Sequence, residues 1–204
     1  NFPGTAQSAS GGYTQFTVYT NNTATSGKTK AVGQGPSPTA ANATIISLGA
    51  TVSGAYGGST QFGGNATADS ALLIAMGGSG GGAGGQIVFY DQSSGGTATV
   101  RLSGNAVLDI SSHAAPGVTI GNLELTGGTI ATTIGSSATC LTISGKLSLN
   151  SSPTAFLFKG ATGFKSGTAY VILTAPNLSS FNVGQFTGNI LNKLTPHFAT
   201  SGTN

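Results

Sequence analysis

Four carboxylates and two histidines are the side chains of this chain best suited to acid–base chemistry. They are Asp69, Asp91, Asp109, Glu124, His113 and His197. Hydrolysis of a glycosidic bond normally needs two carboxylates about 5 to 10 Å apart. Asp91 and Asp109 are the pair that adjacent turns of a repetitive fold would align. We favour solvated turn residues as the interpretation of both, and we expect Arg101 to pair with Asp109 on the outer surface.

Ser79 lies in the glycine-rich stretch Gly77–Gly81, which superficially resembles a serine-hydrolase turn. A nucleophilic serine needs a base and an orienting acid, and neither histidine lies in a recognisable motif. The stretch also lacks the Gly-Lys-Ser/Thr ending of a phosphate loop. The neighbouring Gly80–Gly85 lacks the aspartates of a calcium-binding β-roll. The single cysteine, Cys140, excludes an internal disulfide and a Cys-based zinc cluster. We therefore predict no catalytic centre, no metal and no cofactor.

The charge content is unusually low. Only 5% of the 204 residues are charged, with a net charge of +3, whereas about 25% is ordinary for a soluble domain. The basic residues are scattered, which argues against nucleic acid as a partner. The longest apolar run, Ala71–Met76, is far too short to cross a bilayer, so we predict no membrane insertion. The Ser-, Thr- and Asn-rich polar positions predict an extracellular or cell-surface protein, and we interpret Asn1 as a processed or truncated start.

Short strands are the elements that would position these side chains. No helical stripe persists over ten residues, whereas alternating segments are frequent. In one of them Val100 and Leu102 share a face and Arg101 takes the other. Paired glycines mark turns between the segments. The pattern predicts an all-β protein.

Internal repetition narrows the fold. Phe62 and Phe89 are separated by the same interval as Ala71 and Ala98. An earlier copy of the strand begins at Ala43, at nearly the same interval before Ala71. Short strands and glycine turns that recur at such an interval predict a β-solenoid, in which stacked coils bury a continuous core. A β-sandwich is the alternative, and it would show no fixed longer period.

Three segments follow from this repetition. Residues 41–150 would form solenoid repeats of about 27 residues, a length typical of repeat architectures. Residues 1–40 would form an N-terminal cap or a subunit-exchange arm, because open solenoid ends need covering. Residues 151–204 would form an aromatic-rich C-terminal end of the solenoid.

The repeats resemble those of bacterial autotransporter passengers over roughly residues 40–200. The similar stretches are Gly63–Ala68, Ala71–Ala75, Gly77–Phe89, Gly95–Val100, Gly104–Ser111, Pro116–Leu125 and Gly167–Ala175. The resemblance implies a right-handed parallel β-helix, export to the cell surface, and a role as stalk, adhesin or matrix component. No stretch matches the family's translocator or its protease-type domain, so we expect a released or excised passenger, or a relative that never had a translocator.

The leading hypothesis for function is a non-enzymatic structural protein that self-associates as a homo-oligomer or filament, forming a fibre, stalk or surface layer. The expected contact residues are Phe16, Val18, Tyr19, Phe186 and Phe198. The alternative is an adhesin or glycan-binding passenger that meets surface glycans with exposed tyrosines, namely Tyr13, Tyr19, Tyr56, Tyr90 and Tyr170. Five Asn-x-Ser/Thr sequons make glycosylation a further hypothesis, at Asn21, Asn42, Asn65, Asn150 and Asn177.

Overall fold

The computed structural model describes residues 38–136, 138–150, 152–160, 163, 165–176, 182–189 and 195–200. It also describes the backbone of three N-terminal strands, β1 (Gly4–Gln7), β2 (Tyr13–Phe16) and β3 (Lys28–Lys30). Most of residues 1–37 lie outside the described residues. The predicted division into a cap or arm, repeats and a C-terminal end therefore stays a prediction.

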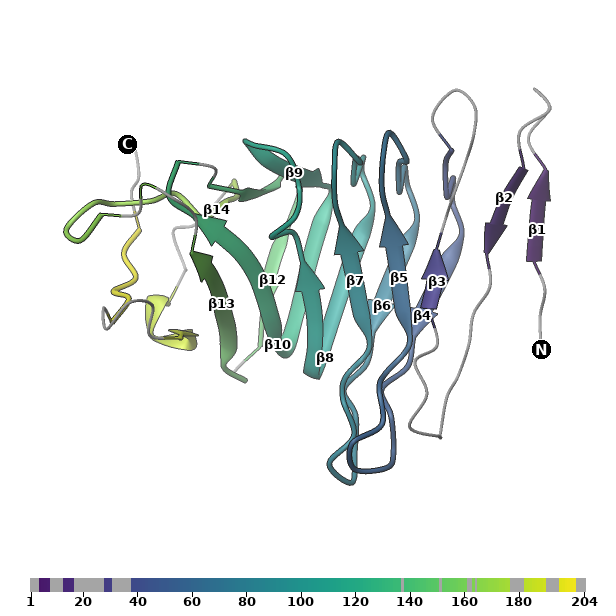
Figure 1. The fold of residues 1–204 in the computed structure, drawn as a ribbon, viewed down its shortest axis with the longest axis horizontal. Helices are drawn as coiled ribbons and strands as arrows, with labels where there is room; N and C mark the ends of the chain where they lie inside the picture. Colours follow the sequence, from purple (N-terminus) through teal and green to yellow (C-terminus); the bar gives the residue numbers. More distant parts are fainter. Residues whose placement is uncertain are drawn as a thin grey trace.

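The chain winds into a β-solenoid of about 4 turns. Among the described residues, every ladder is parallel except the antiparallel β1–β2 pair, which lies beyond β3 at the N-terminal end (Figure 1). The remaining elements are β4 (Thr44–Ser47), β5 (Ser59–Phe62), β6 (Leu72–Ala75), β7 (Gln86–Phe89), β8 (Thr99–Asp109), β9 (Gly117–Ile120), β10 (Asn122–Ile134), β11 (Cys140–Ile143), β12 (Leu147–Leu149), β13 (Thr154–Gly160), β14 (Leu173–Thr174), the 3-10 helix η2 (Val183–Gln185) and β15 (Phe186–Gly188). The prediction of an all-β solenoid with glycine-rich turns is confirmed.

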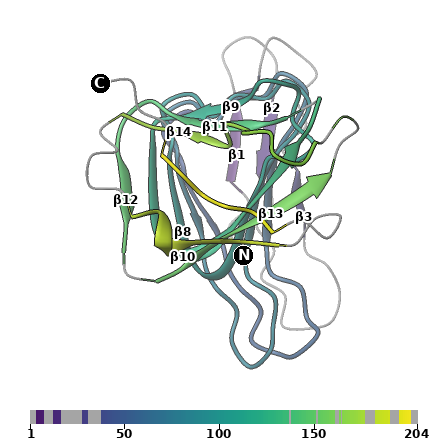
Figure 2. The same ribbon diagram turned by 90° about the vertical axis from the view of Figure 1, so that its left-hand side faces the viewer.

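Each coil has three sides, seen end-on in Figure 2. Face one consists of β4, β6, the first halves of β8 and β10, and β12. Face two consists of β3, β5, β7, the second halves of β8 and β10, and then β13 and β15. Face three consists of β9, β11 and β14. In the earlier coils this side is reduced to turns joined by single bridges.

The repeat has the predicted length only in the first coils. Phe62 lies beside Phe89, and Leu72 lies beside Thr99, both at the spacing expected from the sequence. Thr99 then lies beside Asn122, after a distinctly shorter interval along the chain. The reason is the corner between faces one and two. The coil of β4 and β5 and the coil of β6 and β7, which we call the first two coils, cross this corner through long loops. In the next two coils, β8 and β10 continue around the corner as single strands.

Hydroxyl side chains organise the turns at the side of face three. The Oγ1 atom of Thr39 accepts a hydrogen bond of 2.9 Å from the N–H two residues later. Thr67 and Ser94 repeat this arrangement one and two coils further on, at 3.0 and 3.1 Å. Hydroxyls that bond to the backbone in this way favour turns over strands. They fix the position of the bend in these three successive turns.

Alternation along the strands builds the core. Ile45, Leu73, Val100 and Leu123 point inward from successive coils of face one, and each is at most 5% exposed. An aromatic cluster closes the C-terminal end, formed by Phe156, Phe158, Phe186 and Phe198. Among the described residues, no helix has the length and apolar character required to cross a bilayer.

Candidate interaction surface

Two loops project from the corner between faces one and two, at the bottom of Figure 1. We call residues 48–58 and 76–85 the paired loops, because their backbones bond to each other. Ala50 donates to the carbonyl of Ala83 at 2.8 Å, and Ser79 donates to the carbonyl of Ala50 at 2.8 Å. Ala83 in turn donates to the carbonyl of Ala55 at 3.0 Å. These bonds satisfy backbone groups that a single projecting loop would leave to water.

The third coil holds the paired loops at their base. The Oδ1 atom of Asn105 accepts from the N–H of Gly78 at 2.7 Å, and its Nδ2 donates to the carbonyl of Gly82 at 3.1 Å. Asn105 lies at the point where β8 turns the same corner without a loop. The solenoid therefore completes this corner unaided, and the paired loops are an addition to it. Additions of this kind commonly carry function.

Exposed apolar side chains gather at this place. Seven large hydrophobic side chains of the described residues are exposed, and five of them lie on the paired loops or next to them on β4. We call these five the apolar surface; they are Ile46, Leu48, Val52, Tyr56 and Met76, between 39% and 56% exposed. Gathered exposed hydrophobic residues mark interaction sites, whereas scattered ones need no explanation.

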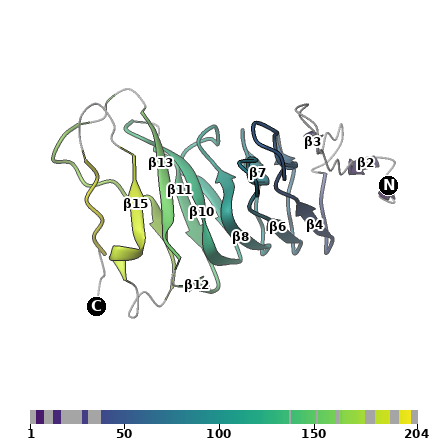
Figure 3. The ribbon, with the colours of Figure 1, turned by 90° about the horizontal axis from the view of Figure 1, so that it is seen from below.

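Face one changes character along its length. Ile46 lies beside Ile74, which lies beside Arg101, which lies beside Glu124 (Figure 3 shows their strands β4, β6, β8 and β10 in succession). The outward column is therefore apolar on the first two coils and charged on the next two. Because later coils of the same face are polar, the solenoid does not itself require the outward isoleucines.

The ion pairs differ from the sequence expectation. Arg101 Nε lies 2.7 Å from Glu124 Oε2, not beside Asp109. Asp109 Oδ2 instead accepts from Lys159 Nζ at 3.0 Å. The cause is the turn within β8, which places Arg101 on face one and Asp109 on face two. The expected Arg101–Asp109 pair is thus wrong.

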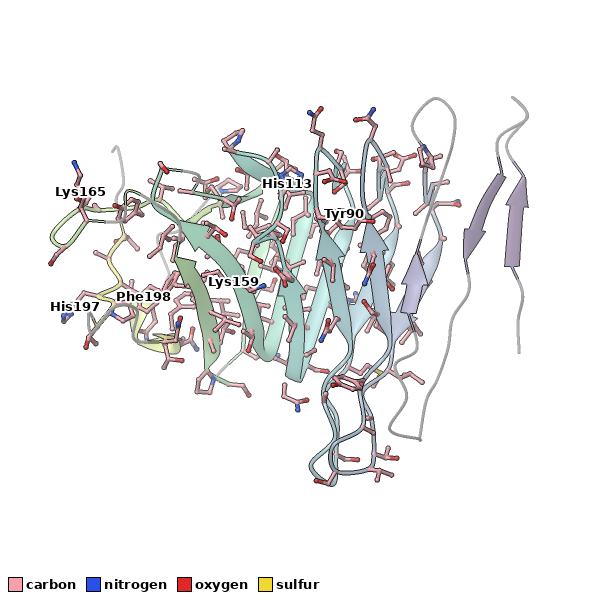
Figure 4. The ribbon with its side chains drawn as sticks, in the orientation of Figure 1. Tyr90, His113, Lys159, Lys165, His197 and Phe198 are labelled. Atoms are coloured by element: carbon pink, nitrogen blue, oxygen red, sulfur yellow. The ribbon has the colours of Figure 1, made fainter. Side chains whose placement is uncertain are left out.

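Charge is sparse in the chain around the apolar surface. Between Lys30 and Arg101 the sequence has two charged residues, Asp69 and Asp91. Asp69 lies in a turn on the side of face three. On that same side, the backbone of Asp91 forms an isolated β-bridge with the backbone of His113. Tyr90 and His113 lie toward the upper edge of Figure 4, opposite the paired loops. Neither loop contains a charged residue, so a partner of the loops meets an uncharged surface.

Among the candidate acid–base residues, the structure separates Asp91 from Asp109 and brings Asp91 beside His113. Asp109 lies beside Val88 and Asp91 lies beside His113, so the two aspartates are not aligned as expected. Both ring nitrogens of His113 contact backbone carbonyl oxygens, Nε2 that of Ser93 at 2.6 Å and Nδ1 that of Ala114 at 2.7 Å. A neutral imidazole has a single N–H, so it donates to one of these two carbonyl oxygens at a time.

The other residues considered for chemistry have structural surroundings. Ser79 closes a turn by accepting from the N–H of Gly82 at 2.9 Å. Cys140 lies on β11, where burial raises the pKa of its thiol despite hydrogen bonds with Thr174 and Thr142 that lower it. Within the described part of the chain, no three His, Cys, Asp or Glu residues gather where they could hold a metal ion.

The expected self-association residues lie at the two chain ends. The backbone of Phe16 belongs to β2, while Val18 and Tyr19 lie outside the described residues. Phe186 is 7% exposed, and its ring centroid is 6.1 Å from that of Phe198. Phe198 lies at the C-terminal end in Figure 4. Both rings contribute to the C-terminal aromatic cluster, and their role between copies stays a prediction.

The tyrosines and sequons have varied settings. Tyr56 is 56% exposed, Tyr90 lies against Gly63 of the preceding coil, and the Tyr170 hydroxyl accepts from Lys165 N–H at 3.0 Å. Tyr13 is described by its backbone alone and Tyr19 not at all. The sequon residues Asn42, Asn65 and Asn150 are exposed, and Asn21 and Asn177 lie outside the described residues.

Sequence reasoning missed the apolar surface, although a signal was present. The segments Thr44–Ser47 and Leu72–Ala75 contain consecutive aliphatic residues, whereas Thr99–Leu102 alternates with Arg101. In a strand, consecutive aliphatic residues necessarily place one of them outward.

In the comparisons with protein families, curated proteins and solved structures, nothing matched the chain.

Proposed function

We propose that this chain is a non-enzymatic extracellular structural protein that self-associates into a fibre, stalk or surface layer. The observation that carries the proposal is the concentration of exposed, uncharged apolar side chains on the first two coils. Exposing such a surface to water is unfavourable, and covering it with protein stabilises the assembly. An autotransporter-like passenger, as the repeats resemble, would present this surface outside the cell.

Low charge supports the same proposal. Net charge keeps soluble proteins apart by mutual repulsion. With a net charge of +3 and 5% charged residues, this chain has little repulsion to oppose close packing of copies. The parallel solenoid provides long, regular faces along which copies can align.

Sedimentation velocity over a hundredfold concentration range, followed by negative-stain electron microscopy, tests the proposal. We expect the mean sedimentation coefficient to rise with concentration and ordered assemblies to be visible at the upper end. A single monomeric species throughout, with dispersed particles in the microscope, would refute self-association.

The paired loops favour a second candidate, an adhesin that binds neutral glycans. Tyr56 is 56% exposed on a projecting and uncharged element, and an aromatic ring in that setting can stack on a sugar. A glycan array probed with the protein and with Tyr56→Ala tests this candidate. Binding that the substitution abolishes would support it, and an array without signal would exclude it for the glycans present.

A further inference from the structure

We infer that the outward face of β4 and β6 packs against the same face of a second copy of this chain. The inference rests on the proposed self-association and names its contact. Besides the exposed Thr44 of β4, five aliphatic or thioether side chains form this face. They are Ile46, Leu48, Leu72, Ile74 and Met76, and we call them the β4–β6 patch.

The register makes the β4–β6 patch continuous. Ile46 lies directly beside Ile74, and Thr44 lies beside Leu72. The N–H of Met76 bonds to the carbonyl of Ser47 at 2.9 Å, which brings Met76 next to Leu48. Paired strands in a parallel ladder are about 4.8 Å apart, so the five side chains are neighbours, and Thr44 is the polar residue of β4 at their margin.

The occupant must be uncharged and apolar, which a second copy satisfies. In the described part of the chain, the exposed large hydrophobic residues outside the first two coils are Leu157 and Val171. Leu157 lies on β13, whereas Val171 lies outside the strands, so the two residues belong to different segments. Among the described residues, the exposed large hydrophobic side chains therefore gather on the first two coils, where the β4–β6 patch is joined by Val52 and Tyr56 of the paired loops. Like surfaces meet through a two-fold axis, with the same residues contributed by both copies.

Charge further along face one fits this arrangement. The patch is followed by Arg101 and Glu124, whose mutual pairing at 2.7 Å leaves no net charge beside the interface. In a two-fold dimer of face one, the apolar residues occupy the centre and these ion pairs lie at its rim. An apolar core with a polar rim is the usual composition of protein interfaces.

The size of the patch predicts the strength of the contact. Ile46, Leu48 and Met76 are 39%, 39% and 44% exposed, so each adds only part of its surface. Five such side chains cover a fraction of the about 800 Å² per partner that a standard stable interface buries. We therefore expect a reversible dimer that forms with rising concentration and that can add to larger assemblies through other contacts.

Charge insertion tests the inference. Ile46→Lys, and separately Met76→Lys, should raise the dimer dissociation constant by about tenfold or more, equivalent to about 1.4 kcal/mol. Leu157→Lys is the matched control, because Leu157 is 41% exposed on face two, and its dissociation constant should not change. Sedimentation equilibrium measures all four proteins, and circular dichroism establishes that each is folded.

The outcomes separate the inference from the proposed function. If the wild type associates and both patch variants associate equally well, the β4–β6 patch is not the contact, although self-association stands. If the wild type remains monomeric, both fail. Should a lysine variant be unfolded, cross-linking replaces it. In a Cys140→Ser background, Ile46→Cys or Met76→Cys should form dimers with a short bis-maleimide faster than Val171→Cys, and equal rates would overturn the inference.

Discussion

The ring of Phe62 is stacked on the ring of Phe89 in the core, with centroids 4.9 Å apart and an interplanar angle of 12°. Each ring belongs to its own coil, and their strands pair in register. The stack therefore connects two repeats through side chains as well as through the backbone ladder. Both rings are at most 1% exposed, which makes them among the largest fully buried groups of the described residues.

Replacing one ring should strongly destabilise these coils. Phe89→Ala should lower the free energy of unfolding by about 3 to 5 kcal/mol, because it removes a buried ring and leaves a cavity. Urea denaturation followed by circular dichroism measures the change. The exposed Leu157→Ala provides the control and should change stability by about 0.5 kcal/mol or less. A similar small loss for both would show that the stack does not stabilise the solenoid.

A second prediction concerns the loop-free corner of β8. Gly104 has a φ of +57°, and a Cβ there would lie 3.1 Å from the Cα of Gly77 in the preceding coil. Gly64 has a nearly identical φ of +58°, with open space around the corresponding position. Gly64→Ala should cost about 1 kcal/mol for the left-handed backbone alone. Gly104→Ala should cost more, because the neighbouring backbone must also move.

Thermal unfolding of both glycine variants decides this point. A lower melting temperature for Gly104→Ala than for Gly64→Ala is expected. Equal melting temperatures would indicate that close contact between coils at this corner does not contribute.

A third prediction concerns the sheet edge at the C-terminal end. Beyond the three residues of β15, the side chain of Asn189 continues the ladder on β13. Its Oδ1 accepts from the N–H of Phe158 at 2.6 Å, and its Nδ2 donates to the carbonyl of Phe158 at 3.2 Å. An uncovered edge of this kind invites pairing with another chain. The Asn189 amide thus occupies a place that a further strand would take.

Asn189→Ala should open this edge. We expect faster amide hydrogen exchange at Phe158 and a loss of about 1 to 2 kcal/mol, since two hydrogen bonds disappear. Aggregation on storage should also increase. Asn65→Ala, in an exposed turn, is the control and should leave exchange at Phe158 unaltered. Unchanged protection in Asn189→Ala would mean that the edge is covered without the amide.

A fourth prediction concerns the pH response of Cys140. Burial raises the pKa of its thiol, so the neutral thiol is favoured in the folded protein. Because the folded state holds its proton more tightly than the unfolded state, stability should fall as pH rises from the usual thiol pKa to the raised one. Alkylation by iodoacetamide should accordingly need a higher pH than alkylation of a short model peptide. Cys140→Ser should remove the alkaline loss of stability attributable to the thiol, and its persistence there would contradict the assignment.

Much of the fold could be predicted because its signal is local and repeated. Phe62 and Phe89 recur at the period of the coil, and paired glycines mark the turns. These features depend on the alternation of strands and on turn chemistry, which each short segment carries by itself. They were sufficient to predict the stacked coils of a β-solenoid, while the parallel arrangement of the strands was what the resemblance of the repeats implied.

The neighbours of a residue in the adjacent coil could not be predicted, because they depend on how the chain turns between strands and not on any single short segment. β8 turns the corner within one strand, which separates Arg101 from Asp109 and shortens the spacing to the next coil. A constant period, extended from the first coils, therefore predicts the wrong cross-coil neighbours from that point onward. Ion pairing of Arg101 with Glu124 follows from the shortened register alone.

The sequence by itself determined the class of architecture, because the spacing of strands and turns follows directly from the order of apolar, polar and glycine residues. The tertiary structure alone decided which aliphatic residues face water. In Thr44–Ser47 and Leu72–Ala75, either set of alternate residues is apolar enough to be buried, so pattern cannot choose between them. The ladder places Ile45 and Leu73 inside and Ile46 and Ile74 outside. That choice creates the β4–β6 patch.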